Sequence, residues 1–271
     1  MKTRILVGTA LVAFLVCLLA FGGYVYAAGL ALFSVAAVYE ISLAFRKKQL
    51  RPITVPLYVF AATFSFVFLL FGEIPLFALY MLCAMTTMVC TVAVKGCTVD
   101  DAIASLFLYV YPGILLLCLL LVYLAFPRPV GLSAACMALA APEFCDALAY
   151  FGGTFFGKHK LCPAISPKKT VEGSASAVVG GVLFGLIVFF LQRLWGGSLQ
   201  LAVLLGLGLA AGVLSQFGDL FASKFKRWAG IKDFSSVFPG HGGIMDRIDS
   251  MLFCAPLVLC VVTVLTKLPG A

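Results

Sequence analysis

Long apolar runs recur along the whole chain, and short breaks that contain polar, glycine or proline residues separate them. A helix needs about 20 apolar residues to cross a hydrocarbon core about 30 Å thick. The runs are continuous, whereas the strands of a membrane β-barrel alternate apolar and polar residues over about ten positions. The pattern therefore predicts an all-α, polytopic membrane helix bundle with nine transmembrane helices, at residues 5–22, 24–45, 53–71, 74–94, 102–126, 131–151, 175–194, 199–222 and 249–266.

Composition excludes a soluble globule. Hydrophobic residues make up 63% of the 271 residues and charged residues 11%, against about 45–50% and about 25% in a soluble domain. So few charges can neither cover a water-facing surface nor keep a chain disordered. We interpret the ten cysteines, which show no CxxC or Cys/His spacing, as packing residues. With no internal repeat evident, we expect one membrane domain over 1–271, in which 1–140 is mainly apolar spans and 141–271 carries the motifs.

The basic residues predict the orientation. With the N-terminus in the cytoplasm, all of the 19 Lys and Arg except Arg128, Arg193 and Lys267 fall on the cytoplasmic side, as the positive-inside rule requires. The net charge of +8 is then a topology signal, and no nucleic-acid partner is expected. Residues 1–27 resemble a signal peptide, but a further span follows directly, so we expect them to be retained. We expect the plasma (inner) membrane, although an organelle membrane would give the same pattern.

Acidic residues gather in the second half of the chain. Most of the 11 lie in or beside two long loops, 152–174 and 223–248, that are predicted on the cytoplasmic side. The chemistry should therefore take place at that membrane face. These residues are Glu143, Asp146, Glu172, Asp219, Asp233, Asp246 and Asp249.

Asp219 lies near the inner end of the eighth predicted span. Ser215, Asp219 and Ser223 are spaced i, i+4 and i+8, which gives one polar stripe on a helix. An ionisable residue at membrane depth is costly and by default indicates a functional site; the alternative is a helix-end aspartate that reaches water. In the same span, Gly208 and Gly212 form a small-xxx-small pair that favours close helix contact.

Asp246 and Asp249 are spaced i, i+3 where the ninth span begins. Two carboxylates on one helical face need a cation between them. Arg247 could supply it as a structural ion pair, or Mg²⁺ could, since it prefers one or two carboxylates plus water and phosphate oxygens. Gly240, Gly242 and Gly243 would let backbone N–H groups approach a phosphate beside a helix N-terminus.

Many lysines and arginines accompany these acids. Any one of them could simply bind anionic lipid or set the topology, but interleaved acids and bases fit a metal-bound polyphosphate better. His241 could donate a proton or a hydrogen bond, and a structural role is equally open. The basic residues are Lys158, Lys160, Lys168, Lys169, Lys224, Lys226, Arg227, Lys232 and Arg247.

Three stretches between positions 146 and 249 carry a dense pattern of charged, glycine and proline residues. The first contains Asp146, Ala149-Tyr150, Gly153, Phe156-Gly157-Lys158, Leu161, Pro163, Ile165-Ser166-Pro167, Lys169-Thr170 and Glu172-Gly173; the second is Gly218-Asp219-Leu220 with Ser223; the third runs from Ser223-Lys224-Phe225-Lys226-Arg227 through Lys232-Asp233 to Phe238-Pro239-Gly240-His241-Gly242-Gly243-Ile244-Met245-Asp246-Arg247-Ile248-Asp249. Together they closely resemble the signature of the CDP-diglyceride synthases (phosphatidate cytidylyltransferases). Residues 1–140 contribute only hydropathy to this resemblance.

The resemblance implies an integral-membrane transferase of phospholipid biosynthesis, built of bundled helices, that converts CTP and phosphatidate into CDP-diacylglycerol and pyrophosphate with Mg²⁺. One substrate is a lipid and the other a water-soluble triphosphate, so the site must lie where headgroups meet the cytosol. The charges gathered at the predicted cytoplasmic face agree with that location. A second, monovalent cation and a homo-oligomer both remain open.

The resemblance and the location together suggest residue roles. Asp219, Asp246 and Asp249 are expected to be metal ligands, with Asp146 as a supporting acid, and Lys226, Arg227 and Arg247 to act catalytically on the triphosphate and leaving pyrophosphate. For substrate binding we expect Ser166, Lys169, Thr170, Glu172, Ser223, Lys224, Lys232, His241, Gly242 and Gly243.

Three other functions fit the sequence less well. An ion-coupled transporter would place charges near mid-span in two related halves, but here the halves differ and the acids cluster at one face. A CTP-using lipid kinase would release CDP instead of pyrophosphate. A CDP-alcohol phosphotransferase is disfavoured because its acidic signature needs an Asp-Gly pair, and this sequence has none.

Overall fold

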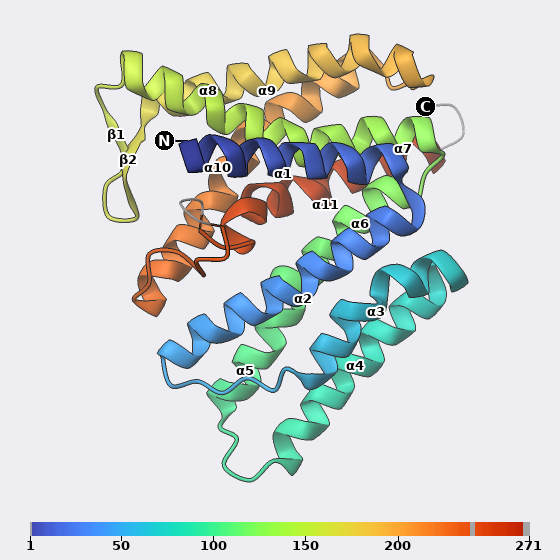
Figure 1. The fold of residues 1–271 in the computed structure, drawn as a ribbon, viewed down its shortest axis with the longest axis vertical. Helices are drawn as coiled ribbons and strands as arrows, with labels where there is room; N and C mark the ends of the chain where they lie inside the picture. Colours follow the sequence, from blue (N-terminus) through green and yellow to red (C-terminus); the bar gives the residue numbers. More distant parts are fainter. Residues whose placement is uncertain (1, 239–241, 268–271) are drawn as a thin grey trace. The chain divides into compact units, whose positions relative to one another are not determined.

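The computed structural model describes residues 2–238 and 242–267, and within these the chain is mostly helical (Figure 1). A kinked segment, η1 (Tyr109–Ile114), in which Tyr111 has non-helical backbone angles, joins α5 to α6. A π-helical turn, η2 (Cys136–Ala140), joins α7 to α8, and a 3₁₀ turn, η3 (Gln192–Trp195), extends α9. The helices are α1 (Lys2–Phe21), α2 (Gly23–Lys47), α3 (Val55–Phe71), α4 (Glu73–Ala93), α5 (Val99–Leu108), α6 (Leu115–Leu124), α7 (Arg128–Ala135), α8 (Ala141–Phe156), α9 (Val171–Leu191), α10 (Leu201–Ala229) and α11 (Met245–Lys267).

The prediction of an all-α, polytopic membrane protein is confirmed. Each of the nine predicted segments falls on a helix or a helix pair of the described chain, and seven are long and apolar enough to cross a membrane. The other two, Val7–Phe21 and Val55–Phe71, are apolar but shorter. The predicted break between the first two spans is confirmed at Gly22 and Gly23, whose φ angles of 61° and 46° suit glycine.

Two compact units make up the fold, and each combines two stretches of sequence. The first unit contains Met1–Leu117 and Lys226–Arg247, and the second contains Cys118–Phe225 and Ile248–Ala271. Helices α10 and α11 each contribute residues to both units. The expected division near residue 140 does not coincide with these boundaries, and the prediction of a single domain stays a prediction.

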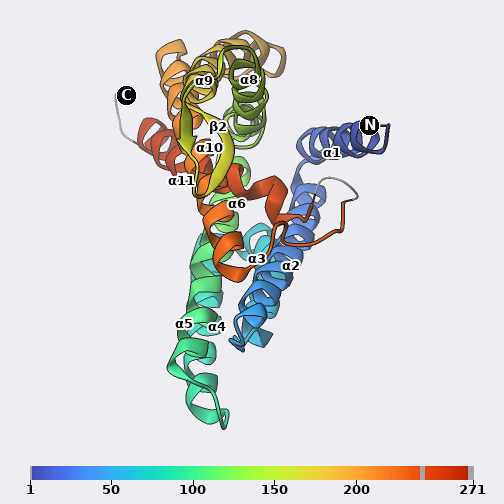
Figure 2. The same ribbon diagram turned by 90° about the vertical axis from the view of Figure 1, so that its left-hand side faces the viewer.

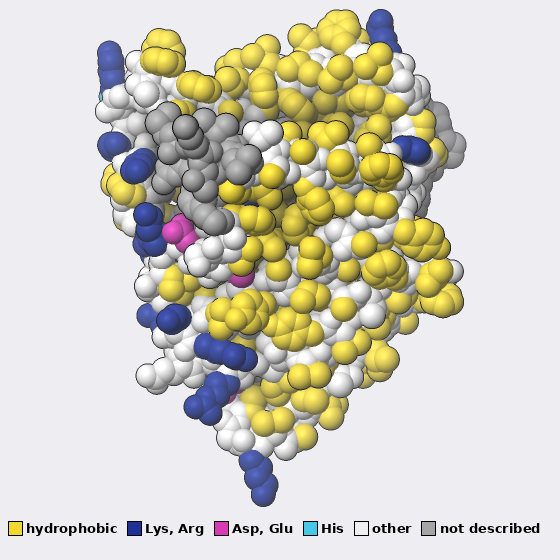
Figure 3. Space-filling view, viewed as in Figure 1, with side chains coloured by type: hydrophobic (Ala, Val, Ile, Leu, Met, Phe, Trp, Pro, Cys, Tyr) yellow, Lys and Arg dark blue, Asp and Glu magenta, His cyan; other side chains and the backbone are white. Residues whose placement is uncertain are grey.

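In the first unit, α2 packs against α3, and α3 packs against α4. Fully buried side chains such as Tyr26, Ile41 and Phe60 form the core, and the Ser65 hydroxyl donates a 2.8 Å hydrogen bond to the Ala27 carbonyl across α2 and α3. Apolar side chains cover much of the surface in view in Figure 3. Val92 on α4, for instance, is 88% exposed, as suits a surface that faces lipid.

In the second unit, α8 packs along α9 (Figure 2), and α9 approaches α10 through glycines. A Cβ atom added to Gly181 would overlap the Gly208 carbonyl oxygen, and one added to Gly212 would lie 2.6 Å from the Val178 Cα. The predicted close contact at Gly208 and Gly212 is therefore confirmed. Without side chains between them, the two backbones touch directly.

The two long loops that are predicted on the cytoplasmic side contain more structure than hydropathy predicts. Within 152–174, β1 (Lys160–Cys162) and β2 (Ser166–Thr170) form an antiparallel hairpin. Helix α10 continues to Ala229, beyond the predicted end of the eighth span at residue 222. Polar side chains lower the hydropathy there but still favour helix, and the helix ends only at Gly230, whose φ is +73°. Helix α11 likewise begins at Met245, before the predicted start at 249.

Candidate functional site

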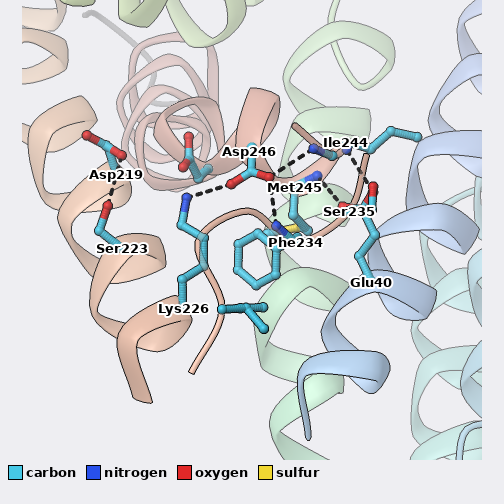
Figure 4. A network of polar contacts seen from close by, with 12 residues as sticks. Glu40, Asp219, Ser223, Lys226, Phe234, Ser235, Ile244, Met245 and Asp246 are labelled. Atoms are coloured by element: carbon cyan, nitrogen blue, oxygen red, sulfur yellow. Dashed lines mark hydrogen bonds and ion pairs between the residues drawn. The ribbon is translucent and has the colours of Figure 1, made fainter. Parts of the chain in front are cut away.

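The first charged cluster lies in the first unit, where the segment between α10 and α11 meets the start of α11 (Figure 4). Asp246, in the first turn of α11, accepts three hydrogen bonds. Its Oδ1 accepts one of 2.5 Å from Lys226 Nζ, and its Oδ2 accepts two of 2.9 Å from the backbone N–H groups of Phe234 and Gly243. Glu40 accepts hydrogen bonds from Ser235 and from the same start of α11. We call Glu40, Lys226, Ser235 and Asp246 the cap cluster.

The ion pair in the cap cluster is buried: Lys226 is 8% exposed and Asp246 9% exposed. Burying a charge is costly unless it is paired and hydrogen-bonded. Both conditions hold for Asp246, and the Lys226 ammonium also lies 5.3 Å from the centre of the Phe234 ring. A carboxylate in the first turn of a helix is further favoured by the helix dipole. The charges of Lys226 and Asp246 therefore satisfy each other within the protein.

The glycine segment before α11 is engaged in the same network. The Gly242 N–H donates a 3.1 Å bond to the Phe238 carbonyl, and the Gly243 N–H donates to Asp246. Gly242 has a φ of +83°, which explains the residue type. Phosphate binding by these N–H groups stays a prediction. Gly240 and His241 lie outside the described residues.

A second charged cluster lies in the second unit, where β2 meets α10. Lys169 Nζ pairs with Asp219 Oδ2 at 2.5 Å, and the Ser223 hydroxyl donates a 3.4 Å hydrogen bond to Asp219 Oδ1. The predicted stripe on one helix face thus exists for Asp219 and Ser223, and Ser215 is fully buried one turn earlier. The partnership with Lys169 joins two motif stretches that are fifty residues apart in sequence.

Asp146 and Asp249 lie on α8 and α11 of the same unit. Ser250 Oγ donates a 3.4 Å hydrogen bond to Asp146 Oδ2, while Asp249 is buried. Helix α11 also runs close to α10, because a Cβ on Gly218 would lie 2.5 Å from the Asp249 carbonyl oxygen. In the second unit, α11 therefore contacts α8 at Asp146 and α10 at Gly218.

Thr170 and Glu172 hold the hairpin to the start of α9. Thr170 is the N-cap of α9, and its Oγ1 accepts a 3.1 Å bond from the Gly173 N–H. Glu172 accepts bonds from the backbone N–H groups of Lys158 and His159, and its Oε1 lies 2.7 Å from His159 Nδ1. Ser166 lies on β2 opposite Cys162. Substrate binding by these residues stays a prediction, and their visible contacts are structural.

Of the basic residues expected to act on the phosphates, Lys224 and Arg227 lie near the end of α10, Lys232 lies in the segment that follows, and Arg247 lies in the first turn of α11. Lys224, Arg227 and Lys232 are exposed, and Arg227 Nη1 donates a 3.2 Å bond to the Ile231 carbonyl. Arg247 is half-buried, and its Nε is buried without a hydrogen-bond partner among the described residues.

Sequence reasoning missed Glu40. This residue lies in α2, is 1% exposed, and accepts hydrogen bonds from Ser235, Ile244 and Met245. The sequence contains a signal for Glu40, because an ionisable side chain inside an apolar run indicates a functional site. Glu40 lies far in sequence from the stretch 143–249, where most of the acidic residues gather.

The metal-ligand prediction stays open. Within residues 2–238 and 242–267, no group of three or more His, Cys, Asp or Glu side chains is arranged to hold a metal ion. Asp219 and Asp249 belong to the second unit and Asp246 to the first.

An open apolar groove of about 380 Å³ lies between α8 and α9 in the second unit. Its walls are formed by aromatic and small side chains, among them Phe151, Phe155, Ala175 and Ser176. A groove of this kind suits a hydrocarbon chain.

Fold and site together define a class: a polytopic helical membrane protein whose described residues include two acid–lysine pairs, Lys169–Asp219 and Lys226–Asp246. Within that class, the chain belongs to the cytidylyltransferase family, whose model matches residues 2–265.

Three proteins named phosphatidate cytidylyltransferase are similar to parts of the chain. The protein from Staphylococcus saprophyticus is 42% identical over 137 residues, which cover 50% of this chain and 51% of the relative. The Thermotoga maritima protein is 36% identical over 149 residues (53% and 54%), and the Aquifex aeolicus protein is 41% identical over 171 residues (62% and 61%). The chain thus spans about half the length of the first of these relatives, and somewhat more of the last.

Proposed function

We propose that this protein is a phosphatidate cytidylyltransferase, which transfers CMP from CTP to phosphatidate and releases pyrophosphate. One observation carries the proposal: in a chain of the cytidylyltransferase family, the Lys226–Asp246 ion pair is buried at the start of α11. A buried ion pair is weak evidence for stability, since apolar residues often pack equally well. Its presence is better explained by phosphoryl chemistry, which needs both charges.

The same pairing of charges supports a common role for Asp219 and Asp246. Each carboxylate is paired with a lysine, Asp219 with Lys169 and Asp246 with Lys226. We propose that Asp219, Asp246 and Asp249 act on the nucleotide, with Asp146 as a supporting acid.

The donor chemistry fits Mg²⁺. Carboxylate and hydroxyl oxygens are the hard ligands that this ion prefers, and both Asp219 and Asp246 already attract an ammonium group. We propose Asp219 and Asp246, with Asp249, as the residues that would hold Mg²⁺. When bound, the ion would neutralise phosphate charge.

The reaction needs positioning and charge neutralisation more than proton transfer. A phosphatidate oxygen forms a bond to the α-phosphorus of CTP, the bond from that phosphorus to the bridging oxygen of the β-phosphate breaks, and pyrophosphate leaves in line. Lys226, Arg227 and Arg247 would neutralise the phosphates, assisted by Lys224 and Lys232. An ionised phosphatidate oxygen needs no general base.

The lipid substrate would approach from the membrane. We propose that an acyl chain of phosphatidate occupies the groove between α8 and α9, whose lining is mostly apolar. We also propose that the site opens to the cytoplasm at the plasma membrane, because all but three of the basic residues lie on the predicted inner side.

A direct assay tests the proposed function. Purified protein in detergent is incubated with radiolabelled CTP, phosphatidate and Mg²⁺, with and without a chelator. We expect chelator-sensitive formation of a liponucleotide and of pyrophosphate in equal amounts. Release of CDP would indicate a lipid kinase, and the absence of any product from CTP and phosphatidate would contradict the proposal.

Lys169→Gln is expected to raise the KM for CTP about tenfold or more. It removes the ion pair with Asp219 and one positive charge from the proposed nucleotide site, and a tenfold change corresponds to about 1.4 kcal/mol. The matched control is Lys168→Gln, since the exposed Lys168 precedes it on β2 and points to the other face of the strand. Steady-state kinetics at varied CTP concentration measure the KM for CTP of both variants. If the two KM values are equal, Lys169 does not belong to the CTP site.

A further inference from the structure

Glu40 is a buried carboxylate that the proposed chemistry leaves unused. It lies in the apolar helix α2, far in sequence from the motif stretches, and is 1% exposed. Its Oε1 accepts hydrogen bonds from Ser235 Oγ at 2.6 Å and from the Ile244 N–H at 2.9 Å. Its Oε2 accepts one from the Met245 N–H at 2.8 Å (Figure 4).

These partners lie where α11 begins. The first N–H groups of a helix have no partner within the helix, and a carboxylate near them is favoured by the helix dipole. Glu40 therefore caps α11 from a different helix. The same α2 carboxylate also holds Ser235, which lies near the middle of the segment between α10 and α11.

Glu40 and Asp246 hold adjacent parts of one short segment. The Gly243 N–H donates to Asp246, while the next two N–H groups, of Ile244 and Met245, donate to Glu40. A Cβ on Gly243 would lie 2.5 Å from both Glu40 carboxylate oxygens and 2.7 Å from Cδ. The residue type at 243 is thus set by how closely Glu40 approaches the backbone.

We propose that Glu40 is a positioning residue for the reaction: it fixes the first turn of α11 and so orients the Asp246 carboxylate toward its Lys226 partner. Glu40 itself does not contact the nucleotide. The expected effect on catalysis rests on the proposed function. The expected effect on the first turn of α11 does not depend on it. It gives α2, which lies outside the motif-bearing half of the sequence, a role in the site.

Glu40→Gln tests the proposal, because glutamine keeps the side-chain size but removes the charge and one acceptor oxygen. Glu73→Gln is the matched control, since Glu73 is exposed in the first turn of α4 in the same unit. The first readout is hydrogen–deuterium exchange of residues 242–247, which needs no activity. We expect exchange at Ile244 and Met245 to accelerate about tenfold or more in Glu40→Gln and to be unchanged in Glu73→Gln.

The second readout is the Mg²⁺ concentration that gives half-maximal cytidylyltransferase rate. We expect Glu40→Gln to raise this midpoint several-fold and to lower kcat, with a smaller shift of both in Ser235→Ala. If Glu40→Gln does not fold, Ser235→Ala carries the test alone. A lower melting temperature with unchanged Mg²⁺ midpoint, or unchanged exchange at 244 and 245, overturns the proposal. Absence of wild-type activity contradicts only the proposed function, because the exchange result still stands.

Discussion

Asp246→Asn is expected to lower cytidylyltransferase turnover by about 100-fold or more. Removing one preorganised electrostatic contact from an active site has an effect of this size. We expect the variant still to fold and insert. Asparagine keeps one oxygen that can accept from the Phe234 and Gly243 N–H groups. It lacks the negative charge that would bind Mg²⁺ and that now pairs with Lys226. The defect should therefore lie mainly in the reaction step.

Stability and activity can be separated in this variant. Asp246→Asn leaves the buried Lys226 ammonium without a countercharge, which lowers the melting temperature. The double variant Asp246→Asn with Lys226→Met removes both charges, so we expect it to regain melting temperature but not turnover. Asp100→Asn is the control, because Asp100 is an exposed aspartate of the same unit. Turnover close to wild type in Asp246→Asn would exclude Asp246 as a metal ligand.

Gly181→Leu is expected to prevent stable folding of the second unit. Even the first side-chain carbon would overlap the Gly208 carbonyl oxygen on α10, so α9 and α10 would have to separate along their contact. Overpacking by added methylenes costs about 1–3 kcal/mol and occasionally more, and here the obstacle is backbone, which moves less readily than a side chain.

Gly206 gives the matched control for this steric prediction. It lies on α10 two residues before Gly208, but a Cβ there meets nothing within 4 Å. Gly206→Ala should keep or slightly raise the melting temperature, because alanine favours helix over glycine by about 1 kcal/mol. Expression yield, size-exclusion profile and melting temperature in detergent provide the comparison. A normal profile for Gly181→Leu would contradict the close α9–α10 contact.

The sequence by itself determined the class of protein and the course of most helices. Burial in lipid demands about 20 apolar residues in one run, so runs such as those of α2 and α9 are visible without tertiary information. The same local logic predicted the break at Gly22 and Gly23 and the Asp219–Ser223 stripe, because both depend on residues close in sequence. Residue type and position in the sequence also indicate Asp219, Asp246 and Lys226 as candidate site residues.

Only the tertiary structure decided which charged groups are partners. Lys169 with Asp219, Lys226 with Asp246, and Glu40 with the start of α11 each join residues distant in sequence. The apolar run ends at residue 222, but α10 continues to Ala229. The polar residues after 222 lower the hydropathy without breaking the helix. Periodicity and composition report the local environment of each residue, whereas pairing of charges depends on helix packing, which no local pattern specifies.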